Sequence, residues 1–319
     1  MADLKPNELL NIDKKYYGKL FKESDFGAML ATQVANDHGF SQVPIRKPEG
    51  SSLVFSLGSD YFLKLTPPFF EDSLEAEIAA TKVIGEQLPF PIPKIVVNGD
   101  IKNWKYVITQ TVPGQQAKDI FKIMEPTNKM TFASDIGYVI KAFNNIDSTG
   151  FERSFGPWDI YLANQLKNQR SIHLNRGNST VWVDKICVFI ETHAPALRKL
   201  SPAKLIHADL NHEHLMLTKI NDIWRISGVI DLADAMNAPI ELEFVLPIIS
   251  FFKGRNEHQQ LLLKEAGYSP QFKLSEYSDI MMALTLQNRF IAFHDWFDRE
   301  IEKGAESIED IASAIFPAL

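Results

Sequence analysis

The sequence contains little cysteine and no long hydrophobic run, and both absences restrict its class. Its one cysteine, Cys187, cannot form an intrachain disulfide, so disulfide-stabilised secreted scaffolds are excluded. The apolar neighbours of this thiol in "DKICVFI" predict a buried structural side chain. The longest apolar run, near "FVLPIISFF", is far shorter than the roughly 20 residues that cross a bilayer. Because "MADLKPNELL" also lacks a signal pattern, we expect a cytoplasmic protein that does not enter a membrane.

An excess of basic residues is also missing. The formal net charge is -7, which argues against a nucleic-acid-binding protein because such proteins need a basic stripe to neutralise phosphates. The same charge is compatible with a cationic substrate. No internal repeat or low-complexity tract is present, and no heptad run forces association. The length of 319 residues suits two domains.

The first part of the chain has an α+β pattern. A helix is expected in "SDFGAMLATQVAND", and two antiparallel strands are expected over residues 51–65. Residues 72–88 should form a helix, and residues 93–110 should form a hairpin that turns at Asn98-Gly99. We therefore expect an N-terminal lobe over residues 1–112, with extra helices at its start.

The rest of the chain is mainly helical. "TVPGQQ" (residues 111–116) is the best connector, and residues 113–319 are expected to form a second lobe. Its helices include residues 131–146 and 180–200 and most of the chain after residue 239. One short β region interrupts them between residues 204 and 232.

Two aspartates occur at strand ends in this β region. Asp209 follows the strand in "LIHADLNHEHLML", and Asp231 ends the strand in "GVIDLAD". If these strands share one small sheet, the two carboxylates can converge. Carboxylate oxygens suit Mg²⁺, which usually works together with phosphates. One carboxylate can accept a proton from an attacking hydroxyl group while the other holds the metal ion.

Lys64 on a predicted strand and Glu77 on the following helix complete this set. A lysine–glutamate pair would hold the ammonium where it can contact nucleotide phosphates. Lys64, Glu77, Asp209 and Asp231 occur in the order used by phosphoryl-transfer enzymes that have a lysine on a β-strand.

At this point the sequence resembles a known family. "HADLNHEHLML…GVIDLADA" is similar to the H-x-D-x-x-x-x-N and I-D-F/W-x-D segments of the aminoglycoside phosphotransferase family, which has the protein-kinase-like fold. "EIAATKVIGEQLPFPIPKIV" resembles the helix, L-P-x-P turn and strand of the same family. The likeness covers roughly residues 50–250. It implies an α+β, two-lobed fold with a small β-rich N-terminal lobe and a mainly helical C-terminal lobe. The same resemblance favours a monomer.

The resemblance implies a role for each charged residue. Asp209 would be the catalytic base, Asp231 would hold Mg²⁺, and Lys64 would contact the α- and β-phosphates. Glu77 would position Lys64, and Glu243 in "ELEFV" would brace the catalytic region.

The nucleotide contacts follow from the same resemblance. Gln110 and Val112 would meet the adenine through their backbone atoms. The loop "KPEGSSLVF" contains only Gly50 and no Gly-x-Gly-x-x-Gly, so Ser51 and Ser52 are expected to let backbone amides approach phosphate.

The sequence departs from the family at His214, which stands where asparagine is usual. An imidazole nitrogen is a poorer Mg²⁺ ligand than an amide oxygen, so this second metal contact is in doubt and Mn²⁺ becomes an alternative. A zinc site made of His207, His212 and His214 has no common ligand spacing. We expect His207 to brace the loop and His212 to face solvent.

The implied function is ATP-dependent O-phosphorylation of a small hydroxylated molecule, with GTP as an alternative donor. An aminoglycoside-like antibiotic is the first candidate acceptor, and choline, homoserine, a sugar or a macrolide are alternatives. Asp295 and Asp298 on a C-terminal helix could bind a cationic acceptor or could simply be solvated. A different class remains open: a catalytically weak pseudokinase that binds nucleotide or a partner.

Overall fold

A computed structural model of the chain describes residues 25–47, 51–153, 156–270, 273–288 and 291–318. These residues form two compact units. The first unit contains the described residues up to Lys82 together with Pro91–Pro113 and Val229–Asp234, and the second contains the remainder. Two short segments therefore depart from a simple division at residue 112, because Val83–Phe90 belongs to the second unit and Val229–Asp234 to the first. The helices expected before residue 25 lie outside the described residues.

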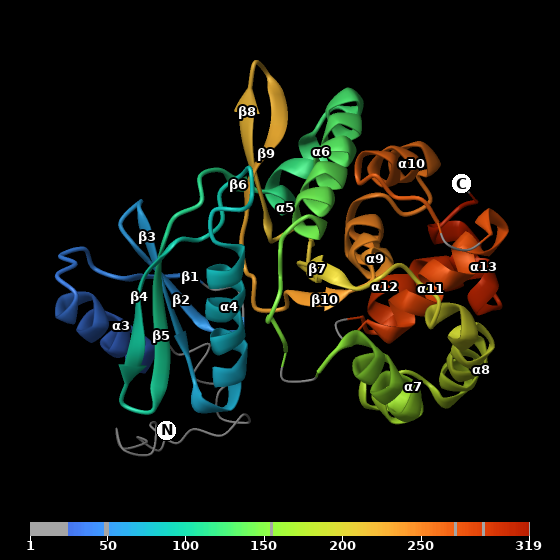
Figure 1. Ribbon diagram of the computed structural model, residues 1–319, viewed down its shortest axis with the longest axis horizontal. Helices are drawn as coiled ribbons and strands as arrows, with labels where there is room; N and C mark the ends of the chain where they lie inside the picture. The colour runs from blue at the N-terminus through green and yellow to red at the C-terminus, as the bar shows by residue number, and fades with distance from the viewer. Residues whose placement is uncertain (1–24, 48–50, 154–155, 271–272, 289–290, 319) are drawn as a thin grey trace. The chain divides into compact units, whose positions relative to one another are not determined.

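The first unit is an antiparallel sheet with helices (Figure 1). Its elements are α3 (Asp25–Asp37), β1 (Ile45–Lys47), β2 (Leu53–Leu57), β3 (Tyr61–Thr66), the short 3₁₀ helix η1 (Pro68–Phe70), α4 (Glu71–Ile84), β4 (Ile95–Ile101) and β5 (Trp104–Gln110). The strand order is β1-β2-β3-β5-β4, which places β3 in the middle of the sheet.

Buried and less buried side chains alternate along Phe62–Leu65 of β3, which shows which side chains lie on each face of the sheet. Leu63 and Leu65 are fully buried in the same apolar cluster as Phe26 and Leu30 of α3. Because successive strand residues point to opposite faces, Lys64 between them points away from α3. It contacts Glu77 of α4 instead. The sheet therefore has α3 on one face and the charged side chains of β3 and α4 on the other.

The helix α3 lies very close to the sheet. A Cβ atom added to Gly27 would come 2.6 Å from the side chain of Leu53, so glycine allows the close approach. Phe26 packs edge-on against Trp104 of β5, with ring centroids 5.9 Å apart. Burying side chains of this size stabilises the fold by about 1.5–3 kcal/mol each.

Two boundaries in this unit differ from the sequence-based expectation. The β4–β5 hairpin turns at Lys102 and Asn103, not at Asn98-Gly99, since Ile101 pairs with Trp104. Gly99 lies inside β4, where it pairs with Tyr106. A Cβ atom at this position would come 2.7 Å from the hydroxyl oxygen of Tyr106, so the close approach requires glycine. The helix α4 ends at Ile84, before the expected residue 88.

The second unit is mainly helical (Figure 1). Its elements are β6 (Gln115–Gln116), α5 (Ala117–Ile120), η2 (Phe121–Ile123), α6 (Pro126–Asn144), α7 (Trp158–Asn175), α8 (Thr180–Leu197), β7 (Lys204–Ile206), β8 (Leu215–Ile220), β9 (Ile223–Val229), β10 (Met236–Ala238), α9 (Ile240–Phe251), α10 (Asn256–Glu265), η3 (Leu274–Glu276), α11 (Tyr277–Gln287), α12 (Phe293–Glu302) and α13 (Ile308–Ile315). The last residue of β9, Val229, belongs to the first unit.

The expectation that the strands before Asp209 and Asp231 share one sheet is wrong. The strand β7 pairs with β10, whereas β9 belongs to a separate sheet of order β6-β8-β9. The partner of β7 is instead the three-residue strand β10, which pairs Met236 with Ile206. Its sequence, Met-Asn-Ala, is too short to predict as a strand from periodicity.

The helix α9 passes through the core of the second unit. Eleven of its residues are buried, as expected for a helix that is apolar around its whole circumference. Two of them are carboxylic acids, Glu241 and Glu243, and both need partners because they are nearly fully shielded from water. The predicted buried state of Cys187 on α8 is confirmed. Among the described residues, no helix has the length and apolar character that membrane crossing requires.

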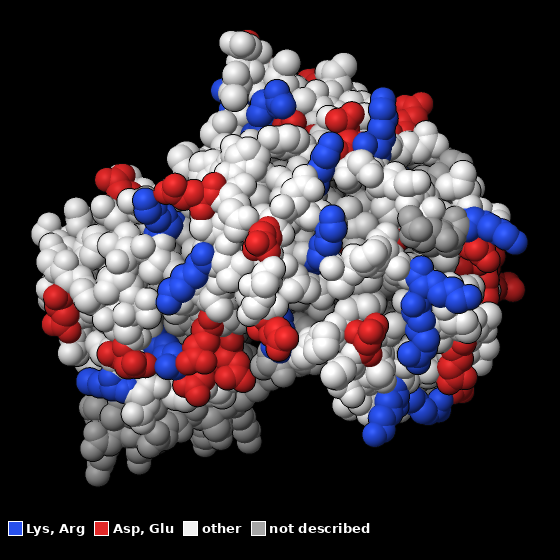
Figure 2. All heavy atoms as spheres, in the orientation of Figure 1, with Lys and Arg blue, Asp and Glu red and all other residues white. Residues whose placement is uncertain are grey.

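Side chains of both charge signs are interspersed over the face drawn in Figure 2.

Candidate active site

Three charged side chains meet on one face of the sheet in the first unit. The Lys64 ammonium of β3 lies 2.7 Å from Glu77 Oε2 of α4 and 3.5 Å from Asp231 Oδ1. The Lys64 and Glu77 side chains are largely buried, whereas that of Asp231 is 36% exposed. The predicted Lys64–Glu77 pair is therefore present, and Asp231, far away in sequence, joins it. This cluster can hold an ammonium in a fixed position beside a solvent-accessible carboxylate.

The neighbouring carboxylates keep the Lys64 side chain protonated. Burial lowers the pKa of this ammonium, but the negative charges of Asp231 and Glu77 outweigh it, so the pKa lies above the usual lysine range. Lys64 therefore stays protonated at any physiological pH.

The backbone at Asp231 adopts a sparsely populated conformation. Its φ is +62°, in the left-handed region that a non-glycine residue rarely occupies. Such strain persists only where surrounding contacts hold it, and it occurs preferentially at functional sites. The segment Val229–Asp234 is anchored in the first unit by the Val229 N–H, which donates to Pro91 O at 3.1 Å.

The expected phosphate loop joins β1 to β2. Ser52 is buried, and its hydroxyl lies 3.0 Å from the hydroxyl of Thr66 on β3. Ser51 is exposed at the start of the described part of this loop, and Gly50 lies outside the described residues. The loop thus presents small side chains beside β3.

The two expected adenine contacts differ in their surroundings. The N–H of Gln110 donates to Lys94 O at 2.9 Å, so this backbone donor already has a hydrogen-bond partner within the first unit. The Val112 side chain is 5% exposed and lies in the core.

Asp209 lies in the second unit, in the loop between β7 and β8. Its N–H donates to Nδ1 of His207 at 3.2 Å. His207 is fully buried and packs edge-on against Phe143, so its predicted bracing role is confirmed. His212 is half-buried, not solvent-facing as expected, and its backbone carbonyl accepts from the Lys118 N–H at 2.8 Å.

The ring of His214 points at Asp209. Its Nδ1 lies 2.8 Å from the backbone oxygen of Asp209 and 3.3 Å from Asp209 Oδ2. The shorter contact requires Nδ1 to carry a proton, because a carbonyl oxygen can only accept. Any metal contact by His214 would therefore use Nε2. Among the described residues, no group of three or more His, Cys, Asp or Glu side chains could hold a metal ion.

A buried glutamate supports the backbone just before Asp209. Oε2 of Glu243 accepts from the Ala208 N–H at 3.0 Å, and Ala208 itself has a φ of +65°. Burial raises the pKa of Glu243 to about 8, against the opposing effect of hydrogen bonds from the N–H groups of Ala208 and His207. Glu243 thus holds the entry to the Asp209 loop in a strained conformation.

The replacement of Glu243 by Gln is expected to change how stability depends on pH. An unfolded glutamate loses its proton near pH 4.5, whereas the folded one keeps it to about pH 8. In that interval the folded state binds the extra proton, so the free energy of unfolding of the wild type falls as pH rises, by up to about 1.4 kcal/mol per unit. Above about pH 8 both the folded and the unfolded state have lost this proton, so Glu243 no longer makes the free energy of unfolding depend on pH.

Glutamine keeps an oxygen for the Ala208 N–H and has no titration, so the variant should lack this decline. Denaturant unfolding at intervals from pH 5 to pH 9 measures it, with the exposed Glu257→Gln of α10 as the control that leaves the slope unchanged. Parallel pH curves for wild type and Glu243→Gln would contradict the prediction.

The two carboxylates suggested for acceptor binding lie on α12. Asp295 and Asp298 are both exposed, and Asp298 Oδ1 lies 2.7 Å from Nδ1 of His294. They remain available to a solute, and no contact described here brings them to the Asp209 loop.

Sequence reasoning missed two groups that order the Asp209 loop. Asn211 contacts the Asp209 carboxylate, and Gln116 of β6 donates to the backbone oxygen of Glu213 at 2.8 Å. The position of Asn211 two residues after an aspartate was the available signal, since asparagine commonly bonds to nearby backbone groups. The contact from Gln116 spans about a hundred residues and has no local signal.

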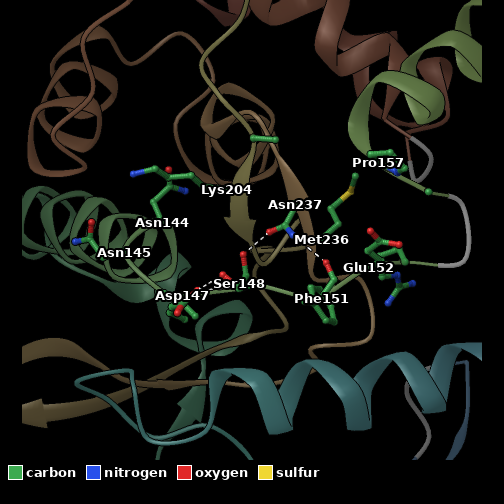
Figure 3. Close-up of a pocket in the computed structure, with 16 residues that line it drawn as sticks. Asn144, Asn145, Asp147, Ser148, Phe151, Glu152, Pro157, Lys204, Met236 and Asn237 are labelled. Atoms are coloured by element: carbon green, nitrogen blue, oxygen red, sulfur yellow. Dashed lines mark hydrogen bonds between the residues drawn. The ribbon is translucent and has the colours of Figure 1, made fainter.

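A cavity of about 570 Å³ also lies in the second unit (Figure 3). It is lined by the end of α6, the chain leading to α7, and the starts of β7 and β10, including Asn144, Asp147, Glu152, Lys204 and Asn237. Lys204 begins β7, whereas Asp209 follows its far end. The residues that line this cavity do not include Asp209 or His214, so it is not the site predicted from the sequence.

Comparisons with known proteins identify the family and the fold of the chain. The model of the phosphotransferase enzyme family matches residues 44–272. Among solved structures, the GDP complex of aminoglycoside 2'-phosphotransferase-IIIa aligns with a TM-score of 0.68 at 15% identity, covering 90% of this chain and 98% of that one. The streptomycin–ATP–APH(2")-IIa ternary complex gives 0.62 at 16% identity, covering 89% and 98%.

A third structure, aminoglycoside phosphotransferase APH(3'')-Id from Streptomyces rimosus, gives a TM-score of 0.58 at 14% identity, covering 83% and 98%. No curated protein matches the chain. The predicted α+β fold class, with a β-rich first part and a helical second part, is confirmed by these alignments.

Proposed function

Because the chain belongs to the phosphotransferase enzyme family, we propose that it transfers the γ-phosphoryl group of ATP to a hydroxyl group of a small molecule. The observation that carries the proposal is the Lys64 ammonium, held 2.7 Å from Glu77 and 3.5 Å from Asp231 inside the matched region. A fixed, permanently charged ammonium beside an accessible carboxylate suits a triphosphate and its divalent cation.

In the proposed reaction, Lys64 binds the α- and β-phosphates and Glu77 fixes its position. Asp231 offers carboxylate oxygens, the ligand type that Mg²⁺ prefers, and His214 Nε2 is a second candidate ligand that suits Mn²⁺ better. When bound, the metal ion would neutralise phosphate charge. Ser51 and Ser52 flank the loop whose amides would approach phosphate, and Gln110 and Val112 are the proposed neighbours of the base.

Asp209 is proposed to receive the acceptor hydroxyl. A carboxylate within hydrogen-bond reach orients the hydroxyl oxygen toward phosphorus and takes its proton as the new O–P bond forms. The leaving group is the nucleoside diphosphate. Rate acceleration would come mainly from positioning and from charge stabilisation, since the phosphoryl group needs little covalent help.

An aminoglycoside is the first candidate acceptor. Three of the similar structures are named as complexes with kanamycin, streptomycin and gentamicin, and the net charge of -7 suits a polycation. Asp295 and Asp298 of α12 are exposed carboxylates that could bind amino groups. Macrolides, choline, homoserine and sugars are the alternative acceptors.

Two measurements test the proposal. The first is the melting temperature of the protein with ATP or GTP, each with Mg²⁺ or Mn²⁺. A ligand at a hundred times its Kd stabilises the folded state by about 2.7 kcal/mol, so a clear rise is expected. The second is nucleotide consumption with kanamycin, streptomycin, a macrolide, choline, homoserine and a sugar as acceptors.

The outcomes separate the candidate functions. Acceptor-dependent consumption with a phosphorylated product supports the kinase. A nucleotide-dependent rise in melting temperature without turnover on any acceptor would favour the pseudokinase. The absence of a rise with any nucleotide and metal ion would overturn the proposal.

A further inference from the structure

The side chain of Asn211 is held at both ends inside the Asp209 loop. Its Nδ2 donates to Asp209 Oδ1 at 2.9 Å, and its Oδ1 accepts from the Glu213 N–H at 2.7 Å. The second contact determines which way the amide points, because a backbone N–H can only donate and must face an oxygen. The group facing Asp209 is therefore the NH₂, a donor.

The Asp209 carboxylate is held at Oδ1 by the Asn211 donor, whereas the His214 ring lies beside Oδ2. Nδ1 of His214 is 3.3 Å from Oδ2, but its proton is donated to the backbone oxygen of Asp209 at 2.8 Å. The rotation of a carboxylate about its last torsion is broad, so few intrinsic barriers fix its plane. The Asn211 donor at Oδ1 therefore matters for that plane, and a carboxylate with about four lone-pair positions can accept it and still receive a further proton donor.

The backbone makes the Asn211 contact rigid. The Asn211 N–H donates to Asp209 O at 2.8 Å, and the His214 N–H donates to Asn211 O at 3.3 Å. Asn211 is partly buried, so water competes weakly for its amide. An asparagine that only capped the loop would need its oxygen but not its NH₂.

We propose that Asn211 is a positioning residue that sets the orientation of the Asp209 carboxylate toward the acceptor hydroxyl. The inference rests on the proposed function, because it assigns Asn211 a task only if Asp209 receives that hydroxyl. Asn211 acts through Asp209 and is not itself a catalytic residue. Misplacement of a reacting group by about 1 Å can reduce the rate roughly 100-fold, so loss of this contact should be visible in kcat.

Two substitutions separate positioning from capping. Asn211→Asp keeps an oxygen for the Glu213 N–H but removes the donor and places a carboxylate against Asp209. Asn211→Ala removes both contacts. Both variants are expected to lose about 10- to 100-fold in kcat, with KM for the nucleotide changed less than about threefold. Asn221→Asp, the same change on the exposed β8–β9 turn, is the matched control and should retain wild-type kcat.

If Asn211 only caps the loop, Asn211→Asp, which keeps the capping oxygen, will retain clearly more kcat than Asn211→Ala, and the inference fails. Equal losses in kcat and in nucleotide affinity would also overturn it, because they would indicate a general distortion of the site.

A second measurement does not depend on turnover. Melting temperatures of Asp209→Ala, Asn211→Ala and the double variant form a double-mutant cycle. We expect the double variant to lose clearly less than the sum of the single losses, because either change alone breaks the same contact. Additive losses would overturn the inference. If the wild type phosphorylates no acceptor, the proposed function is contradicted, but the coupling between Asn211 and Asp209 is not. The double-mutant cycle still measures that coupling.

Discussion

The replacement of Asp209 by Asn is expected to lower kcat about 10²- to 10⁴-fold while nucleotide binding stays near the wild-type level. The amide has the size of the carboxylate but cannot accept the hydroxyl proton, and its NH₂ group cannot accept from Asn211, which now donates to Oδ1. Steady-state kinetics on the acceptor found in the screen, with nucleotide Kd from calorimetry, measure both quantities.

Glu213→Gln is the matched control for this change. It neutralises a carboxylate in the same loop that lies 3.6 Å from Lys118, so kcat should change only slightly. Near-wild-type turnover by Asp209→Asn would remove Asp209 from the proposed role of base.

The replacement of Lys64 by Met is expected to reduce kcat/KM about 10²- to 10³-fold, the usual loss when one group that stabilises developing charge is removed. The volume is kept, but Glu77 and Asp231 lose the cation that lies within 3.5 Å of both. Their negative charges would then repel the triphosphate. Nucleotide affinity should fall together with turnover, and the melting temperature should drop because Glu77 is buried without its partner.

Lys105→Met is the control for Lys64. Lys105 is a strand lysine of the same unit that also pairs with a carboxylate of α4, Glu75 at 3.1 Å, but the Glu75 side chain is 58% exposed. Exposed pairs contribute about 0–1 kcal/mol, so this variant should retain activity and stability. If the two lysine variants lost activity equally, a specific role for Lys64 would be contradicted.

The pH dependence of activity also tests the cluster of Lys64, Glu77 and Asp231. Because the pKa of Lys64 lies above its usual range, its deprotonation should not limit activity between pH 6 and pH 9. A loss of nucleotide affinity in that interval would have to come from another group.

The predicted enzyme class, a small-molecule phosphotransferase, is confirmed by the family match over residues 44–272. It could be recognised without a structure because its charged residues lie in short segments with local signals. Lys64 sits between leucines in an alternating strand, and Asp209 and Asp231 each follow a run of apolar residues. These patterns depend on backbone periodicity, which a linear sequence records directly.

Other features could not be predicted from local patterns. Asn98-Gly99 has the best turn signal in its hairpin, yet packing of Tyr106 against Gly99 keeps it inside β4. The pairing of β7 with β10 depends on a three-residue strand that has no periodicity of its own. In both cases a long-range contact outweighed the local preference.

The sequence by itself determined the α+β class, the phosphotransferase family and the positions of Lys64, Glu77, Asp209 and Asp231, because alternation, helical spacing and motif order are properties of neighbouring residues. Only the tertiary structure decided that Asp231 joins Lys64 and Glu77 in one compact unit. It also decided that Asn211 donates to the Asp209 carboxylate and that His214 donates to the Asp209 backbone oxygen. Hydrogen bonds and ion pairs depend on distance and direction in space. Those quantities are set by packing between segments far apart in the chain, and residue order alone does not contain them.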